Sequence, residues 1–146
     1  MHYNILAIGK PSLTFAQEGI REYEKRLSRY AKLSLNFLKK GEQMDESHRL
    51  IDSSHKTYRI VVDERGDRLT TAQLRQKFDF FEQSGQAKLS FLVGGAEGHS
   101  SELRQRADWI LSLSSMTLQH EIAMLILLEQ LYRLETIKAG SPYHRE

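Results

Sequence analysis

Lys88-Leu-Ser-Phe-Leu-Val93-Gly94-Gly95-Ala-Glu97-Gly98 joins a short apolar run to a cluster of glycines, and Ser100 or Ser101 then opens a short helical segment. The apolar run predicts a buried strand, and the glycines mark its end. In an α/β protein, ligands bind outside the carboxyl ends of parallel strands, where glycines let the backbone approach a ligand closely. Residues 94–98 are therefore either a ligand-binding loop or a tight turn between a strand and a helix.

The rest of the chain repeats this alternation of apolar runs and amphipathic segments. Further strands are predicted at Tyr3–Gly9, Leu33–Phe37, Tyr58–Asp63 (as a central strand) and Trp109–Leu113. Helices are predicted after an N-cap at Ser12, within 41–56, from the capping-box pair Thr70 and Gln73 to Phe81, and over Glu121–Lys138, with a turn at 64–67. This order predicts a single α/β domain over residues 1–146, with a mostly parallel sheet covered by helices on both faces.

Composition excludes several kinds of chemistry. The 146 residues include no cysteine, which excludes a disulfide scaffold, a thiolate zinc site and a cysteine nucleophile. The six histidines lack the spacing of metal ligands, so no metal is expected. The glycine cluster is neither Gly-x-Gly-x-x-Gly nor a P-loop, and no Gly-x-Ser-x-Gly elbow is present. Hydrolase and metalloenzyme functions therefore have no support.

No segment has the pattern of a membrane span or a secretory leader. The longest apolar run, Ile122–Leu128, is far shorter than the roughly 20 residues that cross a bilayer. The first ten residues have neither a basic leader nor a long apolar run. We therefore expect a soluble, cytoplasmic protein that does not bind a membrane.

Basic residues cluster in one part of the chain, although the formal net charge is only +2. Arg21, Lys25 and Arg29 follow one another at intervals of four residues, on the side of the predicted helix opposite its apolar residues. Such a strip either binds phosphate groups or is a solvated helix face.

The predicted helix 121–138 is apolar nearly all round. A helix of this kind is buried on more than one side, which indicates either contact with a second subunit or a single well-packed core helix. Glu129 and Arg133 are four residues apart and are expected to pair along it.

Two further segments contain polar groups suited to a ligand. The loop Leu113–His120 follows a predicted strand and is either a binding loop or a capping loop for the next helix. The last residues include Tyr143, His144 and Arg145, whose side chains can stack on bases, transfer protons and hold phosphates. The alternative for this tail is a disordered terminus, which the residues alone slightly favour.

Four ordered motifs together resemble one known family. They are Leu-Val-Gly94-Gly95-Ala-Glu97-Gly98, the segment from Leu111 through Leu118 to His120, Leu128-Glu129-Gln130-Leu-Tyr132-Arg133, and Pro142-Tyr143-His144-Arg145-Glu146. This combination is similar to the ribosomal RNA large subunit pseudouridine methyltransferase H family of the SPOUT class. The start of the chain and the helix around Tyr23 also resemble that family, so the likeness extends over essentially the whole chain.

The resemblance implies a fold, a reaction and partners. It implies an α/β fold with a C-terminal trefoil knot, an exception to the rule that chains are unknotted. It implies a homodimer that transfers a methyl group from S-adenosylmethionine to N3 of a pseudouridine in large-subunit ribosomal RNA, within the assembled ribosome. Two alternatives remain: a non-catalytic RNA-binding or ribosome-assembly protein of the same fold, and a methyltransferase that acts on another RNA.

The resemblance also assigns residues to roles. The cofactor pocket would use Val62, Gly94 and the run Leu113, Ser114, Ser115, Met116, Thr117 and Leu118. For the reaction itself, our own hypothesis is that His144 handles the proton of N3 while Tyr143 and Arg145 place the nucleotide, in a tail that the partner subunit could supply. We also expect Arg21, Lys25 and Arg29 of the basic strip, together with Arg133, to hold RNA phosphates. The chain departs from many relatives at Gln119, where they have proline, and at Met124, where they have arginine.

Overall fold

Five parallel strands form one sheet in the order β2-β1-β4-β3-β5. The computed structural model describes residues 1–145 of the chain. The strands are β1 (His2–Ile8), β2 (Lys32–Leu38), β3 (Tyr58–Arg68), β4 (Lys88–Val93) and β5 (Trp109–Ser112). The expected parallel α/β sheet is confirmed. The central position, however, belongs to β4 rather than to β3, which lies between β4 and β5.

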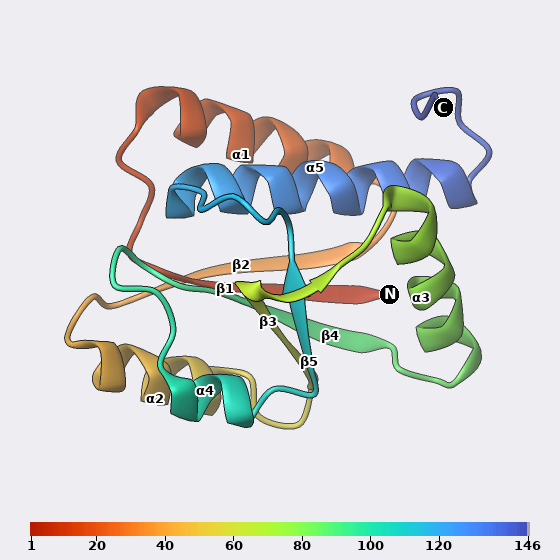
Figure 1. Ribbon diagram of the computed structural model, residues 1–146. Helices are drawn as coiled ribbons and strands as arrows, with labels where there is room; N and C mark the ends of the chain where they lie inside the picture. The colour runs from red at the N-terminus through yellow and green to blue at the C-terminus, as the bar shows by residue number, and fades with distance from the viewer. Residues whose placement is uncertain (146) are drawn as a thin grey trace.

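The helices cover both faces of this sheet. They are α1 (Thr14–Leu27), α2 (Gln43–Ser53), α3 (Thr71–Gln83), α4 (Ser101–Gln105) and α5 (His120–Lys138). In Figure 1, α1, α3 and α5 lie on one face of the sheet, and α2 and α4 lie on the other. The predicted capping box is present, because Thr70 accepts from the Gln73 amide while the Gln73 side chain accepts from the Thr70 amide.

Each face of the sheet has its own apolar core. The larger core joins α1, α3 and α5 to the sheet through fully buried side chains such as Ile5, Phe78 and Phe91. The smaller core joins α2 and α4 to residues such as Leu6 and Val61, on the opposite faces of β1 and β3. Burial on both faces explains why the inner strands are nearly continuous apolar runs, whereas the edge strand β2 alternates apolar and polar residues.

The polar segment 64–67 is not a turn, because β3 continues through it to Arg68. A register shift between Val62 and Asp67 lets both residues pair with Leu111 of β5, so the extra residues form a bulge. The indole N–H of Trp109 donates to Asp67 at 2.8 Å and fixes the far side of the bulge. These contacts come from β5, which is distant in the sequence, and a local turn pattern could not indicate them.

Ser12 is not the N-cap of the first helix. Helix α1 begins at Thr14 after Leu13, whose side chain caps nothing. The amides of Ser12 and Leu13 instead donate to the Glu121 carboxylate at 2.7 and 3.0 Å. The acceptor at the start of α1 therefore comes from the first turn of α5.

Helix α5 is buried on more than one side within this chain, because it packs on the sheet and also along α1, where Leu125 lies against Gly19. Met124, the position where the sequence departs from many relatives, is 2% exposed and belongs to the larger core. Gln119 is the N-cap of α5, since its side-chain oxygen accepts from the amides of Glu121 and Ile122. The homodimer and the trefoil knot stay predictions.

No described helix combines the length and the apolar character that a membrane crossing requires.

Candidate active site

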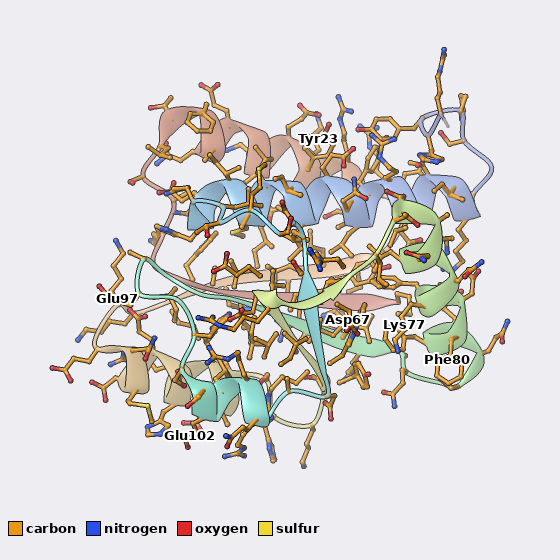
Figure 2. All side chains as sticks on the ribbon, viewed as in Figure 1. Tyr23, Asp67, Lys77, Phe80, Glu97 and Glu102 are labelled. Atoms are coloured by element: carbon orange, nitrogen blue, oxygen red, sulfur yellow. The ribbon has the colours of Figure 1, made fainter. Side chains whose placement is uncertain are left out.

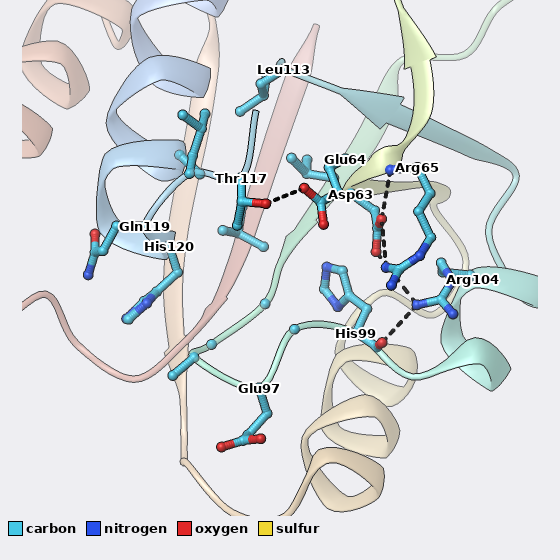
Figure 3. Close-up of a pocket in the computed structure, with 18 of the residues that line it drawn as sticks. Asp63, Glu64, Arg65, Glu97, His99, Arg104, Leu113, Thr117, Gln119 and His120 are labelled. Atoms are coloured by element: carbon cyan, nitrogen blue, oxygen red, sulfur yellow. Dashed lines mark hydrogen bonds and ion pairs between the residues drawn. The ribbon is translucent and has the colours of Figure 1, made fainter. Parts of the chain in front are cut away.

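A cavity of about 890 Å³ opens at the carboxyl ends of β4 and β5, beside the bulge of β3 and the N-terminus of α5. Its volume is in the range of small-molecule sites in proteins. Figure 3 shows its walls: residues 62–65 of β3, the loop 94–98, the loop after β5 and the first residues of α5. The two loops that the sequence indicated as ligand-binding segments therefore meet at one cavity.

Most of the predicted cofactor residues line this cavity. They are Val62, Gly94, Leu113, Ser114, Met116, Thr117 and Leu118. Ser115 lies in the same loop, but it is exposed and is not part of the cavity wall. Val62 and Leu113 are half-buried against the larger core, so the cavity has an apolar floor.

Gly94 leaves room at the base of the cavity. A Cβ atom at this position would lie 3.2 Å from the Gly98 carbonyl carbon and 3.2 Å from Cε1 of His99. The absence of a side chain therefore lets the backbone of the loop turn tightly above the end of β4.

Charged side chains of β3 form another part of the cavity wall. The Asp63 carboxylate is held between Arg65, at 3.3 Å, and Arg104, at 3.7 Å. Thr117 donates its hydroxyl to Glu64 at 2.6 Å, which ties the loop after β5 to the bulge of β3 (Figure 3). The bulge thus places three consecutive charged residues, Asp63, Glu64 and Arg65, in the cavity wall. None of them was predicted as a site residue, because Asp63 has the pattern of a strand end and the other two have that of a turn.

His99 lies beneath the same loop and is almost fully buried, with 7% of its surface exposed. Its Nε2 is 3.0 Å from the Leu92 carbonyl oxygen, which can only accept, so Nε2 carries the ring proton. Burial lowers the pKa of His99 more than the nearby carbonyls and Asp63 raise it. The ring is therefore neutral at pH 7.

Glu121 joins the cavity to the start of α1. Its carboxylate is 6% exposed and accepts from the Ser12 amide, the Ser12 hydroxyl and the Leu13 amide. Burial raises the pKa of Glu121, but these hydrogen bonds and one from Gln119 outweigh burial and hold the pKa below its ordinary value. No sequence motif indicated this contact.

We expect Glu121→Gln to lower the free energy of unfolding by about 2 kcal/mol at pH 7. Because the folded-state pKa is lowered, the ionised carboxylate stabilises the fold above the ordinary pKa of about 4.3, and this contribution is lost as the pH falls through the folded-state pKa. Urea denaturation at several pH values checks this: the difference from wild type shrinks below about pH 4. Glu18→Gln, an exposed carboxylate on α1, is the control. A difference that stays constant down to pH 2–3 would contradict the prediction.

The tail is ordered as far as the structure describes it, so the disordered alternative is wrong. Tyr143 donates its hydroxyl to Glu129 at 3.0 Å, and the Tyr23 hydroxyl lies 3.1 Å from that of Tyr143. Arg133 forms the expected pair with Glu129, at 2.6 Å, and its Nη1 donates to Nδ1 of His144 at 3.1 Å. Burial and these hydrogen bonds raise the pKa of Tyr143, which is therefore a protonated phenol at pH 7.

Within one chain, this tail lies far from the cavity. His120 of the cavity and Arg133 of the tail cluster are on the same helix, and thirteen residues of rise separate them by about 20 Å. In Figure 2, Glu97 of the loop lies at the carboxyl end of the sheet, and Tyr23 lies on the layer of α1 and α5. The structure therefore does not bring Tyr143, His144 and Arg145 together with the predicted cofactor residues of their own chain.

The predicted phosphate ligands differ in their surroundings. Arg21 and Lys25 are exposed on α1, as expected. Arg29 is exposed but lies beyond the end of α1, which is capped at Ser28, so the basic strip is shorter than predicted. Arg133 is only 25% exposed and is already bound to Glu129 and His144.

Comparison with known proteins assigns the chain to a class. A family model described as predicted SPOUT methyltransferase matches residues 1–144. Two solved structures of low sequence identity share the fold. The tRNA (m1G37) methyltransferase from Aquifex aeolicus is 15% identical with a TM-score of 0.56, and the match covers 100% of this chain and 76% of that one. The SpoU methyltransferase AviRb from Streptomyces viridochromogenes, in complex with AdoMet, is 18% identical with a TM-score of 0.52, and the match covers 96% of this chain and 59% of that one. The fold and the match over the cavity-forming residues define a SPOUT methyltransferase.

Comparison with curated relatives assigns the chain to one family within this class. The chain is 46% identical over 148 residues to ribosomal RNA large subunit methyltransferase H of Thermus thermophilus, and the match covers 99% of both chains. It is 39% identical to the protein of that name from Deinococcus radiodurans, again with 99% of both chains covered. The chain therefore belongs to the ribosomal RNA large subunit methyltransferase H family, as the four motifs predicted.

Proposed function

We propose that this protein transfers a methyl group from S-adenosylmethionine to N3 of a pseudouridine in large-subunit ribosomal RNA. The observation that carries the proposal is the cavity at the carboxyl ends of β4 and β5, beside the bulge of β3, which collects all but one of the predicted cofactor residues in a chain of this family. A ribosomal substrate places the enzyme in the cytoplasm.

The cavity suits this cofactor in size and in charge. S-adenosylmethionine, when bound, supplies a sulfonium methyl group that moves to nitrogen by in-line displacement, and the electron pair of the broken C–S bond stays on sulfur. Val62, Leu113 and Leu118 offer apolar surface for the adenine, and the carboxylates of Glu64 and Glu97 favour a ligand with cationic groups. These residues bind and orient the donor, and the narrow base at Gly94 fixes its depth.

The hydrogen bond from Arg133 determines which ring nitrogen of His144 carries the proton. A guanidinium only donates, so His144 Nδ1 accepts and the ring proton is on Nε2. We infer that Nε2–H donates to a carbonyl oxygen beside N3, stabilising the negative charge on the base as the N3 proton leaves to water. The expectation that His144 removes this proton is thus replaced by a donor role, because the ring nitrogen that could accept is already occupied.

A second copy of the chain would bring this tail to the cavity. The tail is built around Arg133 and lies about 20 Å along α5 from the cavity of its own chain. In a symmetric dimer each tail can reach the cavity of the other subunit, so both sites are completed at once. The protein is therefore a homodimer with shared active sites in this proposal.

Calorimetric titration with S-adenosylhomocysteine tests the cofactor site. We expect binding to wild type and at least a hundredfold weaker binding to Gly94→Val, because the added side chain presses on Gly98 and His99 and displaces the loop that forms the cavity wall. Ala87→Val, an exposed position before β4, is the control. Equal binding to Gly94→Val and wild type would place the cofactor elsewhere.

We expect the double charge reversal Arg21→Glu with Lys25→Glu to weaken RNA binding without changing cofactor affinity. Both side chains are exposed on α1, and loss of phosphate contacts reduces the dependence of binding on salt by about one unit of slope for each contact. RNA affinity measured from 50 to 300 mM salt, a range in which counterion release is readily resolved, checks this. Glu18→Lys on the same helix is the control. An equal loss of cofactor affinity would show that the variant damages the fold rather than an RNA surface.

A further inference from the structure

Two buried polar atoms lie unpaired against the loop 94–98. Among the side chains that the structure describes, Glu46 Oε1 and His99 Nδ1 are the buried atoms without a hydrogen-bond partner. A Cβ atom on Gly95 would lie 3.6 Å from Glu46 Oε1, and one on Gly94 would lie 3.3 Å from His99 Nδ1. Both residues are more than nine-tenths buried. The unpaired atoms are therefore next to the same cavity wall.

Both atoms are hydrogen-bond acceptors. Glu46 lies in the first turn of α2, and its other oxygen, Oε2, accepts from the Gly41 amide at 3.1 Å. In His99 the proton is on Nε2, so Nδ1 presents a lone pair. A buried acceptor without a donor destabilises the fold, and such groups in native proteins call for an explanation.

The loop itself contains the missing donors. Its Gly98 amide donates to the Gly95 carbonyl at 3.0 Å. In the described part of the chain, the amides of Gly95, Ala96 and Glu97 have no acceptor among the backbone and side-chain hydrogen bonds. The unpaired acceptor Glu46 Oε1 thus lies beside Gly95, whose own amide and the two that follow are free to bind it.

Gly95 allows these groups to approach one another. A Cβ atom at this position would already lie 3.2 Å from Ile8, so any side chain would hold the loop away from Glu46. With glycine, a small backbone rotation can bring an amide toward Oε1.

We propose that Glu46 is a positioning residue for the cofactor loop: in the cofactor-bound state its Oε1 accepts an amide N–H of residues 95–97 and holds the loop against the ligand. This inference rests on the proposed function, because it takes S-adenosylmethionine as the ligand of the cavity. The carboxylate does not touch the cofactor and acts only through the backbone of the loop. His99 Nδ1 is a second acceptor on the other side of Gly94.

Amide hydrogen exchange and calorimetry with S-adenosylhomocysteine test the proposal. In wild type, the ligand is expected to slow exchange of the amides of residues 95–97. In Glu46→Met, which keeps the length of the side chain but removes both acceptors, this slowing is expected to disappear and the ligand to bind about tenfold more weakly. Glu46→Gln keeps one acceptor, for which Gly41 and the loop compete, so it should show an intermediate effect.

Asp45→Asn is the matched control, since Asp45 is an exposed carboxylate in the same turn of α2. It should bind and exchange as wild type does, and exchange in β1 and β4 should be unchanged in every variant. If Glu46→Met binds like wild type with a protected loop, the positioning role is wrong. If wild type itself does not bind the ligand, the proposed cofactor site fails instead.

Discussion

Arg133→Ala is expected to lower the rate of methyl transfer by about 10²–10³-fold while leaving cofactor affinity within about twofold. Arg133 pairs with Glu129, lies 4.8 Å over the ring of Tyr143 and donates to His144, so its removal releases the tail from α5. The cavity, about 20 Å away in the same chain, keeps all its wall residues. Single-turnover methyl transfer and calorimetry measure the two effects separately.

Arg133→Lys distinguishes two roles of Arg133, the orientation of the tail and the supply of a positive charge. Lysine keeps the positive charge that an RNA phosphate contact needs, but it lacks the fork that holds Glu129 and His144 together. We expect Arg133→Lys to be nearly as impaired as Arg133→Ala. Lys138→Ala, which removes a salt-bridged cation further along α5, is the control. Full activity of Arg133→Lys would contradict the orienting role and would support the role of Arg133 as an RNA phosphate ligand, which the sequence analysis expected.

Mixed dimers show which subunit supplies the tail. Arg133→Ala and Gly94→Val should each be inactive alone, and co-refolding them should restore about a quarter of wild-type activity, because half of the dimers are mixed and each has one complete site. No recovery in verified mixed dimers would mean that tail and cavity act within one chain.

Gly66→Ala is expected to lower the free energy of unfolding by about 3 kcal/mol, the largest stability effect of any glycine here. A Cβ atom at Gly66 would overlap the carbonyl oxygen of Ile110 and lie 2.5 Å from its carbonyl carbon. These are backbone atoms of β5 and cannot rotate away, so the bulge of β3 must move. Asp63, Glu64 and Arg65 would move with it, and cofactor binding should weaken as well.

Gly85→Ala is the comparison for this substitution. Gly85 has a φ of +80°, but nothing lies within 4 Å of its Cβ position, so alanine there introduces only backbone strain of about 1 kcal/mol. Chemical denaturation of the two variants distinguishes a steric clash from a conformational cost. Equal losses would contradict the close approach of β3 and β5.

Residue patterns predicted the sheet well because its strands are buried on both faces. Runs such as Lys88–Val93 and Tyr58–Val62 are apolar without alternation, and the amphipathic helices between them follow from spacing. The turn predicted at 64–67 failed for a physical reason: β5, which comes much later in the chain, pairs with β3 on both sides of this segment, at Val62 and again at Asp67.

The site was predictable in part. Gly94 and the run after β5 stand at strand ends, where topology concentrates ligand sites, and in the structure they line one cavity. Their role as cofactor ligands stays a prediction. Glu46, His99 and Glu121 had no local signature, because their importance comes from burial and from partners on other elements. Ser12 has the pattern of an N-cap, yet Glu121 supplies the acceptor from more than 100 residues away.

Transfer of a labelled methyl group to ribosomes that lack this modification tests the central claim most directly. The protein is incubated with labelled S-adenosylmethionine and such ribosomes, and the product nucleoside is identified by mass spectrometry. We predict N3-methylpseudouridine in the large-subunit RNA, formed by wild type and lost in Gly94→Val. Transfer to a different nucleoside or a different RNA would contradict the substrate assignment, and cofactor binding without any transfer would favour a non-catalytic RNA-binding protein of the same fold.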